Sequence, residues 1–294
     1  MSRRGWILFA AQSLIWGVPY LLISIAVASL RPAAVVAGRT SIAALILLPI
    51  AVHQGALRPA LARWRWVAAF AAIEMAGPFL LLGHAEQTLP SGITGLLVAT
   101  VPIFGALVAF ALGDRHALAP VRLVGMAVGI AGVALVVGAA SGDGDVHLLN
   151  VAEVLFVAVC YATAPFITYR KLDGVPGLGI ATLSLAMVGA LYLPIAAVVQ
   201  DEAPTARSVA ALVALAVLCT AVAFITFFAL IREVGPTKST LITFVNPVVA
   251  LALGVAVLGE TLSAGQLAGL PLVLAGCYLA TRGRPPEPVV VAEP

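Results

Sequence analysis

The stretch TVPIFGALVAFALGD at residues 100–114 is matched by VNPVVALALGVAVLGE at residues 245–260. In each segment a proline near the start is followed by an apolar run that ends in glycine and an acid. Pro247 follows Pro102 by 145 positions (247 − 102). A fixed interval between similar segments indicates internal duplication. The chain is therefore predicted to contain two copies of one unit.

Other residues repeat at nearly the same interval, 144 positions for two pairs of glycines and 145 for the rest. The pairs are Gly125 with Gly269, Gly132 with Gly276, Trp16 with Tyr161, and Gly17 with Ala162. This register predicts a first unit at residues 1–145 and a second at residues 146–282. The proline-rich residues 283–294 are expected to form a disordered cytoplasmic tail.

The composition is that of a membrane protein. Of 294 residues, 62% are hydrophobic and 10% are charged, whereas soluble domains are roughly 45–50% apolar and about 25% charged. The mean hydropathy is +1.11. The net charge of +3 is explained by basic loops that orient membrane proteins. The lipid bilayer is the expected environment, and nucleic acid is not an expected partner.

The apolar residues fall into long runs that are separated by charge, proline and glycine. About 20 apolar residues span a bilayer as a helix. The first run, residues 6–30, is too long for the apolar part of a signal peptide and is interpreted as a helix. The predicted fold is all-α and integral to the membrane, with ten transmembrane helices: 6–30, 33–52, 66–83, 92–112, 120–140, 148–169, 177–199, 208–231, 237–258 and 263–281.

Loop charges predict the orientation, because cytoplasmic loops collect lysine and arginine. With both termini in the cytoplasm, 13 of the 16 basic residues fall on the inner side. These are Arg3, Arg4, Arg58, Arg63, Arg65, Arg115, Arg122, Arg170, Lys171, Arg232, Lys238, Arg282 and Arg284. The predicted outer loops contain most of the acids, namely Glu86, Asp143, Asp145, Asp201, Glu202 and Glu260.

Each copy contains five predicted helices. Because five is odd, the second copy must enter the membrane from the opposite side, so the two repeats are predicted to be inverted (5+5). Inverted repeats place a binding site between the halves at mid-membrane, and secondary transporters use this arrangement for alternating access.

Several short motifs resemble the EamA family of the drug/metabolite transporter superfamily. They are Leu14-Ile15-Trp16-Gly17, Gly38-Arg39-Thr40 with Ala43-Ala44, the Pro102 and Pro247 helices, the Gly113-Asp114 and Gly259-Glu260 ends, and the glycine-rich fifth and tenth helices. The similarity covers residues 6–281, with Asp114 where the family commonly has glutamate. The resemblance implies ten helices, a bacterial inner membrane location, and ATP-independent export of amino acids, other metabolites or toxic compounds.

Charged residues inside predicted helices are candidates for function, because a charge at the bilayer centre costs about 2.5–3.5 kcal/mol on insertion scales. Glu74 is the deepest, and it is interpreted as a proton-coupling carboxylate or as a structural one. Arg39 is interpreted as a coupling charge or as part of a structural ion pair. Glu153 is expected at the outer interface.

Polar and aromatic residues on two related helices predict a substrate cavity. Gln12, Trp16 and Tyr20 share one face of the first helix, and Tyr161 and Pro165 share a face of the sixth. Aromatic faces with polar groups suit an amino acid. The full set of predicted cavity residues is Gln12, Trp16, Tyr20, Glu74, Phe79, His84, Tyr161, Pro165, Thr243 and Asn246.

Prolines and glycines indicate hinges and close packing. Pro102 and Pro247 are repeat-related helix interruptions and are predicted to be hinges, with a static bend as the alternative. Spaced glycines let helix backbones approach closely. They are Gly125, Gly129 and Gly132 in the fifth helix and Gly265, Gly269 and Gly276 in the tenth. The pattern leaves open whether they pack within a monomer or between the chains of a weak homodimer.

The predicted function is export of small metabolites by a secondary transporter, with amino acids, including aromatic ones, as the favoured cargo. Alternatives within transport are drug efflux and nucleotide-sugar exchange. A membrane-embedded enzyme is the alternative outside transport, but no P-loop, HExxH or dinucleotide motif occurs. No catalytic residue, cofactor or metal site is predicted.

Overall fold

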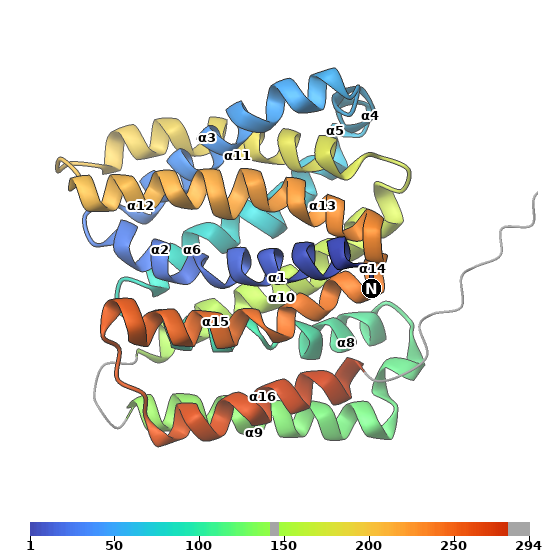
Figure 1. The fold of residues 1–294 in the computed structure, drawn as a ribbon, viewed down its shortest axis with the longest axis vertical. Coiled ribbons are helices and arrows are strands. Elements are labelled where there is room, and N and C mark those ends of the chain that lie inside the picture. Colours follow the sequence, from blue (N-terminus) through green and yellow to red (C-terminus); the bar gives the residue numbers. More distant parts are fainter. Residues whose placement is uncertain (142–146, 282–294) are drawn as a thin grey trace, which may run out of the picture.

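The computed structural model describes residues 1–141 and 147–281. Within these residues the chain is helical and contains no strand. Ten helical segments are long and apolar enough to cross a membrane, and they lie side by side in Figure 1. The predicted all-α membrane fold is confirmed, and the predicted spans agree with the observed ones within a few residues. The predicted tail, residues 283–294, and the predicted boundary between the units lie outside the described residues.

The spans are built from the following elements. Up to residue 141 they are α1 (Arg3–Gly17), α2 (Pro19–Val27), α3 (Pro32–His53), α4 (Leu57–Ala62), α5 (Trp64–Ala71), the π-helical η1 (Ala72–Ala76), α6 (Gly77–Ala85), α7 (Ser91–Val98), α8 (Val101–Ala111), the 3-10 helix η2 (Arg115–Leu118) and α9 (Pro120–Ser141).

From residue 147 onward they are α10 (Leu148–Lys171), α11 (Gly177–Val199), α12 (Ala206–Ala216), the π-helical η3 (Val217–Val222), α13 (Ala223–Val234), α14 (Pro236–Ser239), the 3-10 helix η4 (Thr240–Phe244), α15 (Asn246–Leu253), the π-helical η5 (Gly254–Leu258) and α16 (Ala264–Thr281).

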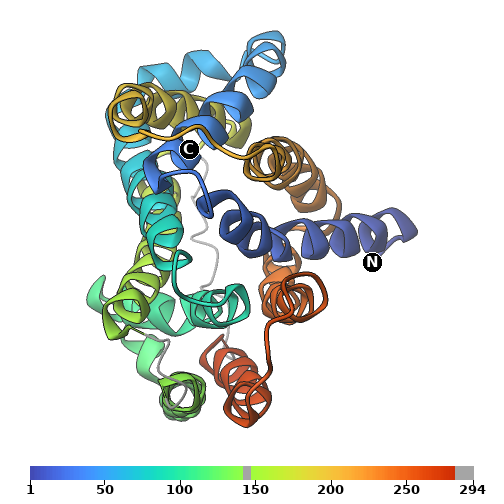
Figure 2. The same cartoon turned by 90° about the vertical axis from the view of Figure 1, so that its left-hand side faces the viewer.

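The helices pair in a pattern that relates the two halves. α3 packs along α11, and α9 packs along α16. Figure 2 shows these two pairs at opposite edges of the molecule. Between them α1 and α2 pack on α12, α13 and α15, while α10 packs on α6, α7 and α8. Each of these contacts has a counterpart in the other half, as a duplicated unit requires. The inverted orientation of the second unit stays a prediction.

Both predicted hinge prolines lie where a span is interrupted. Pro102 is in the first turn of α8, directly after the break that follows α7. Pro247 is in the first turn of α15, after the 3-10 turn η4. Proline is favoured there because N–H groups in the first turn of a helix have no acceptor within the helix, so the missing N–H of proline breaks no hydrogen bond. The hinge role of these prolines stays a prediction.

The first span also contains a break that the sequence pattern did not indicate. The predicted helix 6–30 is two helices, α1 and α2, which meet at Val18. Pro19 occupies the first turn of α2, and its ring cannot continue the hydrogen bonding of α1. A Cβ on Gly17 would lie 2.4 Å from Val249 Cβ, so this break brings the first span close to the ninth.

The third and eighth spans each contain a π-helical turn. η1 begins at Ala72 and η3 begins at Val217, an interval of 145 positions (217 − 72), which is the interval of the proline motifs. π-helical turns are rare and often occur at functional sites. η1 contains Glu74, and η3 contains Thr220. The duplicated pattern therefore extends to an irregular backbone feature beside the candidate site.

The predicted glycine faces meet inside one chain. A Cβ on Gly276 would lie 2.3 Å from Gly129 N, and a Cβ on Gly132 would lie 2.7 Å from Val273 N. Such distances leave no room for a side chain, so α9 and α16 pack backbone to backbone. Gly125 and Gly269 lie along the same contact. Gly265, which was predicted with them, is only partly buried.

Candidate transport site

A buried arginine on α3 faces α6 and η3. Arg39 Nε donates to Thr220 Oγ1 at 2.9 Å, and Arg39 Cζ lies 3.8 Å from the centroid of the Phe79 ring. Thr220 Oγ1 in turn donates to the Leu215 carbonyl at 2.9 Å. Arg39 is 8% exposed. Its terminal nitrogens form no hydrogen bond with the described residues, so they remain available to a ligand.

Two tyrosines lie near this arginine. The charge of Arg39 acts on the hydroxyl groups of Tyr20 and Tyr161. The charge of Glu74, a partly buried acid in η1, acts on Tyr161 as well. Tyr161 is therefore within electrostatic reach of a buried cation and a partly buried acid. We call Tyr20, Arg39, Glu74, Phe79, Tyr161 and Thr220 the central polar cluster.

The other predicted cavity residues of the first span lie toward the eighth and ninth spans. Gln12 Oε1 accepts from Thr226 Oγ1 at 2.5 Å, and Gln12 Nε2 is buried without a partner in the described structure. The rings of Trp16 and Phe227 have centroids 4.6 Å apart. These contacts form a mixed polar and aromatic surface where the first and eighth spans meet.

Asn246 joins the ninth span to the first. In the amide orientation that pairs each atom correctly, its nitrogen donates to the Ile242 carbonyl at 2.9 Å and to the Ser13 carbonyl at 3.1 Å. These bonds bridge the break before α15, where proline removes a backbone donor.

Like Gln12, Trp16 and Asn246, the remaining three predicted cavity residues lie outside the central polar cluster. His84 Nδ1 lies 2.8 Å from Glu153 Oε2, and this contact links the third and sixth spans. Pro165 is exposed on α10, and Thr243 is partly buried in η4. Helical spacing places residues on a common face, but the neighbouring spans decide which part of that face is enclosed.

Glu86 lies in the loop after the third span, as the sequence predicted, but its side chain is buried, which the sequence did not indicate. Glu86 N donates to the Leu82 carbonyl at 2.9 Å, and Glu86 is the C-cap residue of α6. It is 4% exposed, and neither carboxyl oxygen has a partner in the described structure. Burial, together with the Glu260 charge, holds the pKa of Glu86 well above the usual carboxyl range.

Glu260, at the end of the ninth span, caps the N-terminus of α7. Its carboxylate accepts from Ser91 N at 2.7 Å, from Ser91 Oγ at 2.7 Å and from Gly92 N at 3.1 Å. A carboxylate is stabilised at this position by unpaired N–H groups and by the helix dipole. A Cβ on Gly254 would lie 2.3 Å from Glu260 Oε2. The Gly259-Glu260 motif therefore joins the ends of the fourth and ninth spans that are predicted to face outward.

The sequence also matches a family model. The EamA-like transporter family matches residues 3–138 and 151–282. The chain belongs to this family. The two matched segments correspond to the two halves of the molecule, five spans in each. The protein is therefore a membrane transporter of the EamA type.

Curated relatives of this EamA-like protein have names that describe transport. The chain is 29% identical over 289 residues to an uncharacterized inner membrane transporter, YedA, of Escherichia coli K12, covering 95% of the chain and 92% of the relative. It is 27% identical over 285 residues to a probable terminal-alkyne amino-acid exporter of Streptantibioticus cattleyicolor, covering 96% and 94%. A solved crystal structure with 20% identity has a TM-score of 0.66 and covers 96% of this chain and 97% of that one, which supports the fold.

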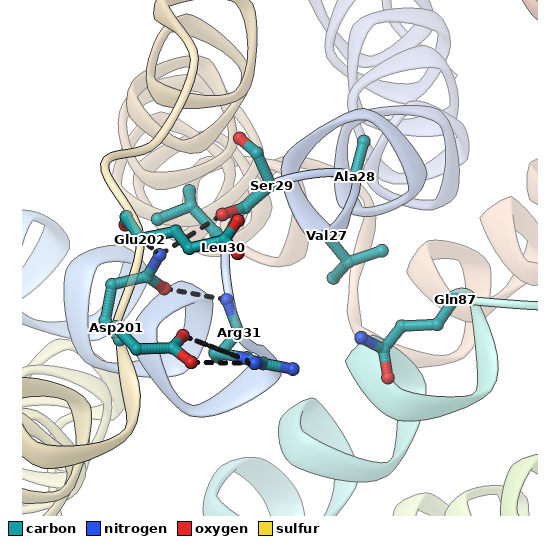
Figure 3. Close-up of a pocket in the computed structure, with 9 residues that line it drawn as sticks. Val27, Ala28, Ser29, Leu30, Arg31, Gln87, Asp201 and Glu202 are labelled. Carbon is teal, nitrogen blue, oxygen red and sulfur yellow. Dashed lines mark hydrogen bonds and ion pairs between the residues drawn. The ribbon is translucent and has the colours of Figure 1, made fainter.

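Two cavities lie at the ends of this EamA-like fold. The first, shown in Figure 3, has a volume of about 270 Å³ and lies between the loop after α2, Gln87 and the loop after α11. Arg31 Nη2 lies 3.2 Å from Asp201 Oδ2, and Arg31 N donates to Gln200 Oε1 at 2.8 Å. The hydrogen bond from Arg31 lowers the pKa of Asp201. This cavity lies at the end of the molecule that is predicted to face outward.

The second cavity, of about 390 Å³, lies at the opposite end, where Figure 1 shows α4 and the N-terminus. Its lining is basic and aromatic and consists of Ala62, Arg63, Trp64, Arg65, Trp66, Arg170 and Lys171. Arg63 Nη1 donates to the Lys171 and Asp173 carbonyls at 3.0 Å each. Basic residues with interfacial tryptophans are typical of a cytoplasmic membrane surface.

Proposed function

We propose that this EamA-like transporter exports amino acids and binds them at the central polar cluster. The observation that carries the proposal is the geometry of Arg39. Its Nε is fixed by Thr220 and its face is packed on Phe79, while its terminal nitrogens remain free among the described residues. A guanidinium held in this way binds a carboxylate through two parallel hydrogen bonds.

The acid of the cluster supplies the second half of amino-acid recognition. Glu74 and Arg39 both act electrostatically on Tyr161, so both charges lie within electrostatic reach of this residue. An amino acid that places its carboxylate at Arg39 and its ammonium at Glu74 pairs both charges. Pairing removes the cost of leaving them buried and alone.

The aromatic residues favour a cargo with an apolar side chain. Trp16 and Phe227 form a ring pair beside the cluster, and Tyr20 and Tyr161 are part of it. The relative named a probable terminal-alkyne amino-acid exporter supports the amino-acid class. A nucleotide sugar fits less well, since the cluster contains a single basic residue and a diphosphate needs several.

Transport by alternating access is supported by the asymmetry of the two ends. At the outer end α7 packs against α15 and also against α2. The corresponding segments at the other end are η4 and α8, and among the described residues these share no comparably extensive contact. We propose that the outer end is closed and the inner end open in this conformation, with Pro102 and Pro247 as the hinges.

The first test is a counterflow assay in proteoliposomes with labelled phenylalanine, leucine, a nucleotide sugar and a cationic dye. Phenylalanine and leucine are expected to exchange, and the other two compounds are not. Exchange of the dye alone would support the drug-efflux alternative instead. Exchange of none of the four would contradict the proposed cargo class.

Glu74→Gln tests the ammonium half of the site. The variant is expected to lose about tenfold or more in apparent affinity for phenylalanine, because a charge-assisted hydrogen bond contributes about 1.5–3 kcal/mol. Competition by 3-phenylpropionate, which lacks the amine, is expected to change little. Glu153→Gln is the matched control, since Glu153 pairs with His84 away from the cluster. An equal loss for both competitors would rule out an ammonium contact.

A further inference from the structure

Glu86 has no role in the cargo site proposed above, yet it is the most thoroughly buried acid described in the chain. It is the C-cap residue of α6 and begins the turn that leads into α7. Its exposed fraction is 4%, and both of its carboxyl oxygens lack a hydrogen-bond partner in the described structure. An ionised carboxylate is not stable in such a place without a cation or donors.

The charged and titratable groups that face Glu86 come from three neighbouring elements. They are Glu260, which follows η5, Arg39 on α3 and Tyr20 on α2. Arg39 directs its Nε to Thr220 instead. At the same end His84 and Glu153 pair with each other. None of these groups forms a hydrogen bond or an ion pair with Glu86 in the described structure.

Glu260 is the acid whose charge acts on Glu86. It accepts three hydrogen bonds from Ser91 and Gly92 at the N-terminus of α7, which stabilises its negative charge. A second negative charge at Glu86 would be repelled by Glu260, and the Ser24 backbone is the only donor near it in the described structure. In the closed outer end, a neutral Glu86 is therefore the form that fits.

We propose that Glu86 is a proton-binding site and that its proton stabilises the closed outer end of the transporter. The inference deepens the proposed alternating-access cycle. Opening the outer end separates α7 from α15, admits water to the turn after α6 and lets Glu86 ionise. Closing the end requires Glu86 to take up a proton from the outer solution while Glu260 rebinds α7.

The direction of the pH effect follows from the two states. In the open state a hydrated Glu86 has an ordinary carboxyl pKa, and in the closed state burial and Glu260 raise that pKa. Protonation therefore favours closure fully when the pH is below the ordinary carboxyl pKa of the open state, and this preference is lost as the pH rises through the raised pKa of the closed state. Between these two pKa values the equilibrium constant for opening should rise by about tenfold per pH unit.

A cysteine at Thr94 can report the state of the outer end without any cargo. Thr94 is on α7, one turn inside Ser91, and is fully buried (0% exposed). Its hydroxyl bonds only to the Pro90 carbonyl of the same turn. The experiment uses Thr94→Cys in a full-length chain whose three native cysteines are replaced by alanine. Proteoliposomes are treated with a membrane-impermeant maleimide across a pH series.

Labelling of Thr94→Cys is expected to be slow at acidic pH and to accelerate as the pH rises, with a plateau at the alkaline end. Gln87→Cys provides the reference, because Gln87 is exposed at the same end and corrects for the reactivity of the thiol itself. Adding Glu86→Gln should give slow labelling at every pH, whereas with Glu86→Asp the labelling rate should still increase as the pH rises. Adding Glu260→Gln should give fast labelling throughout.

The proposal would be overturned if the labelling rate of Thr94→Cys still changes with pH in the same way after Glu86→Gln is added. It would also be overturned if Thr94→Cys alone is labelled at the same rate at every pH while the variant with Glu260→Gln is labelled rapidly. If Glu86→Gln does not fold, the midpoint in Glu86→Asp decides, because an unchanged midpoint contradicts the assignment. The assay contains no amino acid. A failure of the proposed cargo class would therefore leave its result intact, and the two proposals can fail separately.

Discussion

Arg39→Gln is expected to lower phenylalanine counterflow by about 100-fold. Glutamine keeps a donor for Thr220 but removes the charge and the paired donors that a cargo carboxylate requires. Losing a charge-assisted contact of this kind costs about 1.5–3 kcal/mol. Initial rates in proteoliposomes, normalised to the amount of reconstituted protein, measure the effect.

Two further variants separate recognition from folding. Arg39→Lys keeps the charge and loses the planar donor pair, so it should retain more activity than Arg39→Gln but less than the wild type. Arg207→Gln changes an exposed arginine at the outer end and should transport normally. Phenethylamine, which lacks the carboxylate, should compete equally well in the wild type and in Arg39→Gln. Selective loss of phenethylamine competition would refute a carboxylate contact at Arg39.

Gly276→Ala is expected to lower the apparent melting temperature in detergent by at least about 5 °C. The new Cβ would lie 2.3 Å from Gly129 N and 2.7 Å from Gly125 O. Both are backbone atoms, so α9 and α16 must move apart. Overpacking of this kind typically costs 1–3 kcal/mol. A thermal shift followed by size-exclusion chromatography measures the loss of folded protein.

Gly138→Ala is the matched control on the same pair of helices. Gly138 lies near the end of α9, and a Cβ there would meet nothing within 4 Å. Alanine is also the better helix former by about 1 kcal/mol, so the melting temperature should be unchanged or slightly higher. Equal destabilisation by both substitutions would show that helix propensity, not the contact with α16, determines the loss.

The overall fold was predictable from the sequence because the bilayer imposes a simple rule. A spanning segment must be long, apolar and helical, and the run from residue 177 to residue 199 satisfies the rule so clearly that the predicted and observed bounds coincide. The break at Val18 was not predicted. A proline in the middle of an apolar run is compatible with either a kink or a new helix, and contact with Val249 accompanies the break.

The candidate site was predictable only in part. Arg39 and Glu74 were identifiable because charges inside apolar runs are costly. Thr220 was missed, because a lone threonine in an apolar helix gives no signal until the π-helical turn η3 presents it to Arg39. Such a turn depends on hydrogen-bond register, which composition does not reveal.

Glu86 shows a different limit of sequence reasoning. It stands between an apolar run and the polar residues Gln87 and Thr88, which is the pattern of a loop. The residue does lie in the turn after α6, yet its side chain is only 4% exposed. A loop pattern predicts where the helix ends, but it does not reveal which neighbouring spans cover a side chain at that end.

The close approach of α9 and α16 has a consequence for stoichiometry. In small membrane proteins a glycine-lined helix face commonly serves as the seam between subunits. Here Gly129, Gly132 and Gly276 are already occupied by contacts within the same polypeptide. A second copy would therefore have to bind elsewhere on the lipid-facing surface, and the folded monomer has no exposed glycine seam on these two helices that remains to be covered.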